Sequence, residues 1–379
     1  MAGAQELLRP FDSSQTRPDA PYVARWLVMC SGPTDLSQRL NWRDSTTMSE
    51  HGNAVHRLAL VGAGQVGSRH LQGLARLQLP CEIDVVDSSS ESLKTALARF
   101  EEVGANPMIR AIRFHTSMDA LPRELDYVIV ATSADVRLGV VQRLLERASV
   151  RRLLLEKVLF QNIGDYELAR ALLAEHAVMC WVNCTRRAYP IYSDIREFFA
   201  ADPIRHFQVR GGGWGLGCNS VHFLDLLGML TDDVPEQLSA RDLDPTLIPS
   251  KRKDFFEFTG TLRGRYRRGT EVEITSLANS SARRLQTFRS ERRVCMVDET
   301  AGCAFFLATD STALWERKDF RMPLTSELAT PLAAQILTHD ACALPTFEQS
   351  VAYHLPLVDT LGRHAAAFLG TSPEFCPIT

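Results

Sequence analysis

Short apolar runs alternate with amphipathic stretches between about residue 57 and residue 183. The runs have the length of buried strands, and the stretches between them place apolar residues at helical spacing. Strands that alternate with helices predict a parallel, doubly wound sheet of the α/β class. The expected strands are 58–61, 83–86, 112–115, 126–131, 153–155 and 178–182, and the expected helices are a first one that ends at 77 and others at 92–100, 136–147 and 165–175.

The pattern changes after residue 184. Later apolar segments joined by turns predict a mostly antiparallel sheet, with strands at 206–210, 255–262, 270–277, 287–288, 294–298 and 304–308. Helical spacing occurs at 190–200, 220–230, 326–338 and 347–369. We therefore expect a doubly wound domain at 57–183 and a second α/β domain at 184–379 with a C-terminal helix.

Residues 1–56 lack a sustained hydrophobic period and are rich in Ser, Asp, Arg, Thr and Pro. Two hypotheses are open. Translation starts at Met48, whose following residues lead into the first strand, or the segment is an arm that packs on the body of the protein through residues 26–29. Residues 1–56 are thus expected to be either a disordered or packed extension, or the product of a wrongly assigned start.

Composition excludes several classes of protein. The chain has 379 residues, of which 45% are hydrophobic and 23% charged, with a formal net charge of -3. This balance gives no electrostatic case for binding nucleic acid or an anionic membrane, and no apolar run approaches the roughly 18 residues of a membrane span. The nine cysteines are scattered, and Cys180 and Cys184 have no second pair at zinc-site spacing. We expect a cytoplasmic protein with reduced cysteines and no metal site.

The first expected strand runs directly into Gly62-x-Gly64-x-x-Gly67. In such a motif the first glycine permits a tight turn, the second lets a pyrophosphate approach the backbone, and the third lets the helix pack on the strand. The helix then starts with Gln65 and Val66, and this end of the helix dipole favours phosphate. The motif predicts a dinucleotide site that includes these five residues.

Acidic and polar residues follow the next strands. Asp87 ends the second strand, where a carboxylate binds the ribose hydroxyls of NAD and repels the 2′-phosphate of NADP. A helix N-cap is a second, compatible role for it. Ligands of doubly wound sheets lie at the carboxyl ends of the strands, where Thr132 and Lys157 are also expected. NAD is the expected cofactor, and NADP is the alternative.

Three further features follow in order: Glu156-Lys157 after the fifth strand, Arg186-Arg187 before a proline, and His222-x-x-Asp225. With the glycine motif, this order resembles the Gfo/Idh/MocA oxidoreductases over about residues 57–368. The resemblance implies a Rossmann domain followed by an α/β domain with an open sheet. It also implies oxidation or reduction of sugars, inositols and related hydroxy compounds with NAD or NADP, by a homodimer or homotetramer. The last residues, from 344 onward, resemble a polysaccharide-biosynthesis branch.

The resemblance assigns roles to single residues. Lys157 would bind and stabilise the substrate oxygen, and His222 would exchange the proton of the reacting hydroxyl. Thr132 and Ser133 correspond to the loop beside the nicotinamide, and Glu156 is placed in the cofactor site. Plainer roles stay open for both candidate catalytic residues: Lys157 as a surface lysine paired with Glu156, and His222 as a histidine on the inner face of a core helix.

Two positions depart from the family's pattern. Val158 stands where a proline usually follows the lysine, often after a cis peptide bond. A cis bond before a non-proline residue costs about 2.5–4 kcal/mol, so we expect a different presentation of Lys157. Cys218 stands where an acid usually precedes the histidine by one helical turn. Asn219 could supply a polar contact instead, and Asp225, on the same helix face, could hold His222 or the glycine-loop backbone.

The remaining candidates concern the substrate. Arg186 and Arg187 either bind an anionic group of the substrate or cofactor, or brace the two domains. The segment 211–217 has five glycines and is predicted to be a flexible wall of the substrate site rather than a phosphate loop, and Trp214 within it could stack on a sugar. We assign Arg187, Trp214, Asn219 and Asp225 to substrate binding.

Two functions remain. The first is an NAD(P)-dependent oxidoreductase acting on a sugar, nucleotide sugar or related hydroxy compound. The second is a non-catalytic dinucleotide-binding sensor or scaffold, which Val158 and Cys218 favour.

Overall fold

The computed structural model describes residues 55–309 and 314–379. The Met48 start and the packed arm, the two hypotheses for the segment before the first strand, therefore lie outside the described residues. The chain divides into two units, and all described residues belong to the second, Glu50–Thr379.

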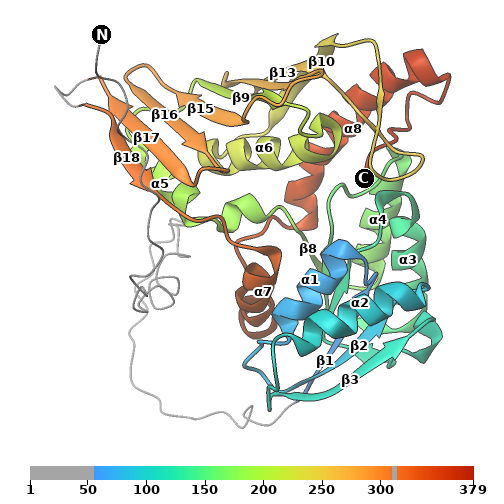
Figure 1. The fold of residues 1–379 in the computed structure, drawn as a ribbon. Helices are drawn as coiled ribbons and strands as arrows, with labels where there is room; N and C mark the ends of the chain where they lie inside the picture. Colours follow the sequence, from blue (N-terminus) through green and yellow to red (C-terminus); the bar gives the residue numbers. More distant parts are fainter. Residues whose placement is uncertain (1–54, 310–313) are drawn as a thin grey trace, which may run out of the picture. The chain divides into compact units, whose positions relative to one another are not determined.

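The first half of this unit contains a six-stranded sheet in the order β3-β2-β1-β5-β7-β8 (Figure 1). Every neighbouring pair in it is parallel, so the predicted doubly wound sheet is confirmed. Its strands are β1 (His56–Val61), β2 (Cys81–Val86), β3 (Ile109–His115), β5 (Tyr127–Val130), β7 (Arg152–Leu155) and β8 (Met179–Val182). The connecting helices are α1 (Gln65–Leu74), α2 (Ser90–Glu101), α3 (Ala134–Arg147) and α4 (Gly164–Glu175).

The burial of the strands explains why this half of the fold could be predicted from the sequence. All residues of β5 and β7 are buried, because helices cover both faces of a parallel sheet. Their sequences are accordingly continuous apolar runs, apart from Arg152, which pairs with Asp340. A short turn of 3-10 helix, η1 (Met118–Ala120), and a two-stranded sheet of β4 (Glu124–Leu125) and β6 (Ser149–Val150) complete this half.

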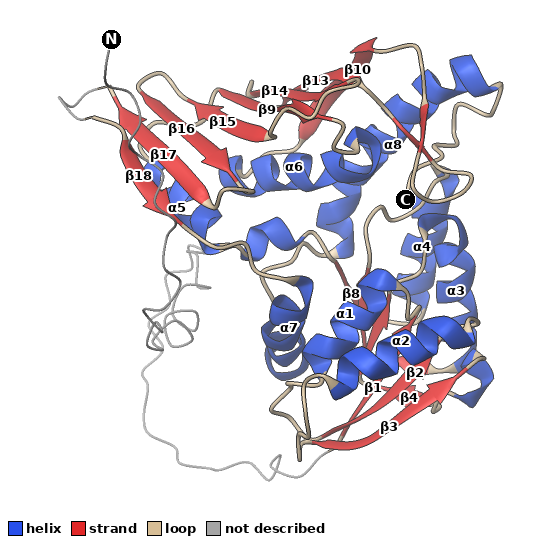
Figure 2. Cartoon of the chain, viewed as in Figure 1, coloured by secondary structure: helices blue, strands red, loops and turns tan. Residues whose placement is uncertain are grey.

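The second half contains an eight-stranded sheet in the order β10-β13-β14-β9-β15-β16-β17-β18. Within this sheet β9 and β14 pair in parallel and the other neighbours are antiparallel, so the sheet is mostly antiparallel, as predicted. Helices α5 (Pro190–Phe198) and α6 (Leu216–Thr231) lie along one side of it (Figure 2). The strands are β9 (His206–Gly212), β10 (Pro235–Leu243), β13 (Gly260–Tyr266), β14 (Glu271–Leu277), β15 (Leu285–Arg289), β16 (Arg293–Asp298), β17 (Cys303–Ala308) and β18 (Glu316–Asp319).

Three features of this sheet differ from the prediction. The strand expected at 255–262 is two strands, because β12 (Phe256–Glu257) pairs with β11 (Ile248–Pro249) and only β13 joins the large sheet. The edge strands β10 and β18 were not predicted. An edge strand has one neighbour and is less buried, so its sequence need not alternate. Strand β10 is mostly half-buried or exposed, and β18 is fully exposed.

Three C-terminal segments return toward the first sheet. Helix α7 (Thr325–His339) packs on α1, where Thr330 donates a hydrogen bond to the carbonyl of Gly73 at 2.7 Å. Helix α8 (Phe347–Leu369) contacts β8, α6 and β10. Residues 374–379 then lie beside the segment that follows β7, where Cys376 N donates to Gln161 O at 2.9 Å. One continuous hydrophobic cluster therefore includes residues of both sheets.

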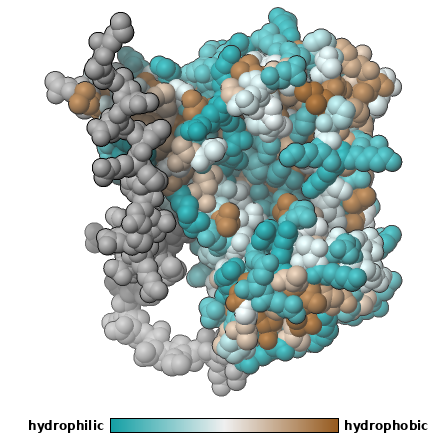
Figure 3. Space-filling view, viewed as in Figure 1, coloured by the Kyte–Doolittle hydropathy of each residue, from teal (hydrophilic) through white to brown (hydrophobic). Residues whose placement is uncertain are grey.

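On the face drawn in Figure 3, hydrophobic side chains form small areas separated by hydrophilic ones. Within residues 55–309 and 314–379, no helix combines the length and apolarity that a membrane crossing requires.

Candidate active site

The three glycines after β1 have three different environments. Gly62 has φ +94°, and a Cβ on it would lie 2.9 Å from the backbone of Ala131 and Thr132. A Cβ on Gly67 would lie 1.8 Å from the carbonyl oxygen of Gly62. A Cβ on Gly64 would meet no described atom within 4 Å. Two glycines thus permit close packing, and the third leaves open space beside the backbone.

The start of α1 can accept an anion. Gly64 is its N-cap, no side chain of the described residues caps the helix, and its first turn carries no acid. Free N–H groups at a helix start favour phosphate. Arg99 of α2 adds positive charge here, since it donates to the side chain and the carbonyl of Gln65 at 2.7 and 3.1 Å. Arg99 could not be predicted, because it approaches the loop only in the folded chain. These residues fit a dinucleotide pyrophosphate.

Asp87 is fixed against the glycine loop. One carboxylate oxygen accepts the N–H of Ala63 at 2.7 Å, and the other accepts the N–H of Ser89 at 2.8 Å. The N-cap of α2 is Ser89, whose hydroxyl accepts the N–H of Ser92, so the cap role considered for Asp87 was wrong. Its position at the end of β2 supports the predicted ribose contact.

Arg137 of α3 joins the loop after β5 to the segment after β7. Its buried guanidinium donates to the carbonyls of Thr132, Val158 and Leu159. Burial lowers the pKa of Arg137 to about 10, which leaves it charged at neutral pH. Thr132 follows β5, and its buried hydroxyl has no hydrogen-bond partner among the described residues. Ser133 is the N-cap of α3 but makes no side-chain cap bond to it. Both hydroxyls remain candidates for the cofactor site.

Lys157 follows β7 and reaches the second half of the protein. Its ammonium donates to the carbonyl of Cys218, in the first turn of α6, at 3.4 Å. The peptide bond between Lys157 and Val158 is cis, contrary to the different presentation expected from Val158. Lys157 and Glu156 interact through their charges, but the Glu156 carboxylate forms its hydrogen bonds with His70 and Asn183 instead.

Glu156 is 7% exposed and lies beneath the strand ends. Its carboxylate is 2.8 Å from His70 Nε2 of α1 and accepts the amide of Asn183, after β8, at 2.6 Å. Burial acts to raise its pKa, but the hydrogen bond and charge of His70 and the charge of Lys157 outweigh it, so the pKa is lowered. A direct cofactor contact was expected, yet this side chain instead joins α1 to the ends of β7 and β8.

His222 lies in α6, one helical turn after Cys218, and is 8% exposed. Burial and then the charges of Arg186 and Lys157 hold its pKa well below the usual range. It is therefore neutral at physiological pH. Its Nδ1 is buried and has no hydrogen-bond partner in the described part of the chain. A neutral imidazole with an unused nitrogen can act as a base.

Glu257 of β12 is a site residue that the sequence did not single out. Its two oxygens accept the N–H groups of Gly217 at 2.6 Å and Cys218 at 3.3 Å, at the start of α6. Burial raises its pKa, against the opposing hydrogen bonds and the charge of Lys157. Because its two-residue strand falls near the start of the longer strand predicted at 255–262, nothing distinguished this acid from a surface residue.

Around the loop before α6, two side chains that were predicted to bind substrate, Trp214 and Asn219, form hydrogen bonds within the protein. Asn219 donates to the carbonyls of Trp214 and Gly215 at 3.1 and 3.0 Å, so the contact considered with His222 is replaced by a loop contact. The indole of Trp214 donates to Thr275 O at 2.9 Å, and the guanidinium of Arg284 lies 5.5 Å from its ring centre.

The two arginines after β8 are braces. They lie in η2 (Thr185–Ala188), and each pairs with a buried carboxylate of the second half. Arg187 donates to both oxygens of Asp225 at 2.8–3.0 Å, and Arg186 donates to both oxygens of Glu299 at 2.8 Å. Asp225, at 0% exposure, therefore holds Arg187 rather than His222 or the glycine loop.

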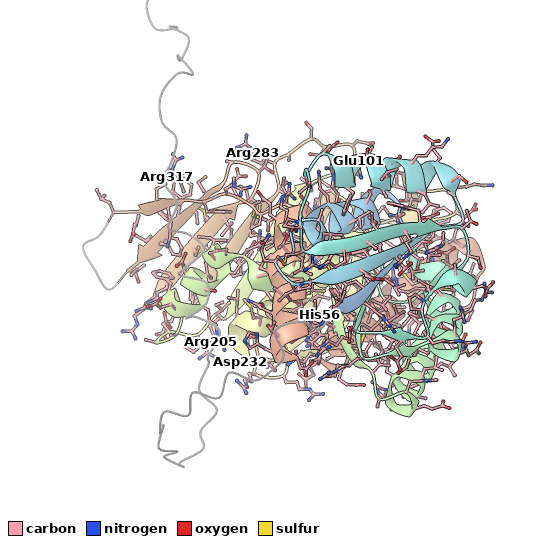
Figure 4. The ribbon with its side chains drawn as sticks, turned by 90° about the horizontal axis from the view of Figure 1, so that it is seen from below. His56, Glu101, Arg205, Asp232, Arg283 and Arg317 are labelled. Carbon is pink, nitrogen blue, oxygen red and sulfur yellow. The ribbon has the colours of Figure 1, made fainter. Side chains whose placement is uncertain are left out.

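The outer part of this cluster reaches the surface of the second half. Arg284 donates to Glu299 at 2.8 Å, and the neighbouring Arg283 pairs with Asp298 at 3.0 Å. Arg283 lies in that half of the protein in Figure 4. The salt bridges thus link the segment after β8 to the sheet and to the helix that carries His222.

A model of the oxidoreductase family with an NAD-binding Rossmann fold, Gfo/Idh/MocA, matches residues 56–184. This domain belongs to the Gfo/Idh/MocA oxidoreductase family. Its cofactor is accordingly of the NAD type, and the open glycine loop fits such a group. No curated protein matches the chain.

Several solved structures share the two-sheet fold of this chain. UDP-N-acetylglucosamine 3-dehydrogenase GnnA from Acidithiobacillus ferrooxidans has a TM-score of 0.61 at 19% identity, covering 84% of this chain and 100% of that one. KijD10, a 3-ketoreductase from Actinomadura kijaniata in complex with NADP, has a TM-score of 0.60 at 17% identity, covering 81% and 96%. The transcriptional regulator Gal80p from Kluyveromyces lactis has a TM-score of 0.63 at 15% identity, covering 83% and 93%. Enzymes and a regulator thus share this fold.

Proposed function

We propose that the protein is an NAD(P)-dependent oxidoreductase that transfers hydride between nicotinamide and a CH–OH carbon of a sugar, nucleotide sugar or related hydroxy compound. The observation that carries this proposal is the meeting of Lys157, from the dinucleotide domain, with the first turn of α6 at 3.4 Å. The same helix presents a neutral His222 one turn later. A cation and a base from two domains are thus brought together beside a dinucleotide-binding fold.

The two side chains have complementary roles. The nicotinamide, when bound, accepts or donates the hydride. The Lys157 ammonium would donate a hydrogen bond to the substrate oxygen and stabilise negative charge as it develops there. The imidazole of His222 would take the hydroxyl proton during oxidation and return it during reduction. NAD is the favoured form, because Asp87 lies beside the glycine loop, where a 2′-phosphate would meet its charge.

A nucleotide sugar is the substrate class we favour, since GnnA and KijD10 share the fold and their names describe 3-dehydrogenase and 3-ketoreductase activities. Trp214, Asn219, Arg187 and Asp225 would shape its site from the loop and brace positions described above. We also propose a cytoplasmic homodimer or homotetramer that associates through the large sheet, which light scattering on the purified protein would test.

The test is NADH fluorescence titration followed by turnover on a panel of UDP- and TDP-sugars. We expect Lys157→Met and His222→Gln each to lower kcat by about a hundredfold or more while NADH still binds. Lys94→Met and His339→Gln, at exposed positions, are the matched controls. Full turnover in the Lys157→Met, His222→Gln double variant would refute these roles.

A non-catalytic dinucleotide sensor is the second candidate. Cys218 in place of the usual acid favours it, as does the likeness to a transcriptional regulator. It predicts NADH binding with no turnover of any substrate in the panel, and no effect of Lys157→Met on NADH affinity.

A further inference from the structure

The N–H groups at the start of α6 bind the carboxylate of a distant residue, Glu257, because the first turn of α6 has no acid of its own. Cys218 occupies the position of the expected acid, and Glu257, from a different strand, places its two oxygens 2.6 and 3.3 Å from the N–H groups of Gly217 and Cys218. Lys157 donates to the carbonyl of the same Cys218 at 3.4 Å. One helical turn is thus in contact with a cation from one domain and an anion from another.

We propose that Glu257 is the positioning residue that replaces the missing acid at 218, by holding negative charge at the turn that leads to His222 and that Lys157 also contacts. This inference rests on the proposed oxidoreductase function and adds a residue to its site. Glu257 would fix the start of the His222 helix, and its charge would attract and orient the Lys157 ammonium for its hydrogen bond to the substrate oxygen.

Contacts behind Glu257 fix its strand. Phe256 N donates to Pro377 O at 2.8 Å, and β12 pairs with β11. A Cβ on Gly217 would lie 2.9 Å from the Ile378 side chain and 3.0 Å from a Glu257 oxygen, so a glycine at this position leaves room for the close approach of the carboxylate. The side chain of Glu257 is nevertheless partly exposed, so it is accessible to a ligand.

The surroundings of Lys157 single out this acid. The charged and titratable groups that act with it are Glu156 beside it, Cys184 after β8, Cys218 and His222 of α6, Glu257 of β12 and His354 of α8. Burial holds the thiols and imidazoles in their neutral forms. The two carboxylates differ, because Glu156 is committed to His70 and Asn183. Glu257 is the one bound to the turn that Lys157 contacts.

The first experiment compares pH profiles of kcat for the wild type and Glu257→Gln, with the best nucleotide sugar. Gln keeps a carbonyl oxygen for the helix N–H groups and loses the charge. We expect kcat about tenfold lower at neutral pH. Because burial raises the pKa of Glu257, the wild type loses the same charge as pH falls, so the two rates converge at acidic pH. A purely structural cap would give the same ratio at every pH, and that result, or an unchanged kcat, would overturn the proposal.

The second experiment moves the charge. Cys218→Asp in the Glu257→Gln background returns an acid to the family's position and should restore most of the lost kcat. Cys218→Ser in the same background is the uncharged control and should restore none. Thermal unfolding of each variant checks that all are folded, and a failed rescue in folded protein would contradict the proposal.

A third measurement does not need turnover. Burial and then the charge of Glu257 raise the pKa of the Cys218 thiol to about 12. Glu257→Gln should therefore speed iodoacetamide alkylation of Cys218 at pH 9, measured by peptide mass spectrometry, with Cys342 as the internal reference. Equal rates would show that the charge of Glu257 does not act on Cys218 and would contradict the proposal. If alkylation responds while no substrate turns over, the oxidoreductase function fails and the placement of Glu257 stands.

Discussion

The glycine loop and the start of α6 are both helix starts at a candidate site, and they are built differently. At the glycine loop the contacts that the motif requires come from the loop and the strand that follows it: Gly67 packs on Gly62, and Asp87 binds the loop backbone from the next strand. At α6 the contacts come from distant segments: Lys157 from the first domain and Glu257 from β12. A site made of local contacts is visible in a motif, whereas a site made of distant ones depends on the whole fold.

The largest expected effect is that of a substitution in the glycine loop. Gly67→Ala places a Cβ 1.8 Å from the Gly62 oxygen, a contact that the loop cannot relieve without moving the strand or the helix. We expect a loss of about 3 kcal/mol or more in the free energy of unfolding, measured by urea denaturation. Gly64→Ala is the matched control: its Cβ meets no described atom within 4 Å, so it should fold normally and weaken NADH binding.

If Gly64→Ala binds NADH as tightly as the wild type, the pyrophosphate does not approach the backbone there. If Gly67→Ala is as stable as Gly64→Ala, the close packing of α1 on the loop is not required.

The next effect concerns the distant contacts behind α6. Glu299 accepts hydrogen bonds from Arg186, Arg284 and Tyr192. Burial opposes ionisation, but the charge and hydrogen bonds of Arg186 prevail and lower its pKa from 4.5 to about 2. An acid whose pKa is lower in the folded state stabilises the fold at pH values above its unfolded pKa of 4.5. This stabilisation is lost as the pH falls toward the folded pKa of about 2. The shift corresponds to roughly 3 kcal/mol.

The measurement is urea unfolding of wild type and Glu299→Gln between pH 7 and pH 3. The wild type should be more stable at pH 7, and the difference should shrink as pH falls below 4.5. Subtracting the variant removes the other carboxylates, which titrate in both proteins. A difference that stays constant with pH would show that the charge of Glu299 is not what stabilises the second half.

The same contrast explains what the sequence could predict. Gly62, Gly64, Gly67 and Asp87 could be predicted as candidates because each is needed by the backbone next to it. Lys157 and His222 could be predicted as candidates through the family's order of residues. The hydrogen-bond partners of Glu156, Asp225 and Asn219 could not be predicted, because the sequence of one strand or helix does not indicate which distant residues it contacts in the folded chain. Glu257 left no local signal, since a two-residue strand is too short to show a period.

The smallest effect tests a contact between the C-terminal segment and the cofactor loop. Helix α3 starts after Ser133 without a side-chain cap from that residue, and the N–H of Ala134 instead donates to the hydroxyl of Thr379 at 3.0 Å. Thr379→Val removes this acceptor at nearly constant volume and should cost about 1 kcal/mol of unfolding free energy. Thr379→Ser keeps the hydroxyl and should cost less than half as much.

Because the contact also fixes the loop of Thr132 and Ser133, Thr379→Val should weaken NADH binding more than Thr379→Ser does. Equal NADH affinity in the two variants would mean that this long-range contact stabilises α3 without shaping the cofactor site.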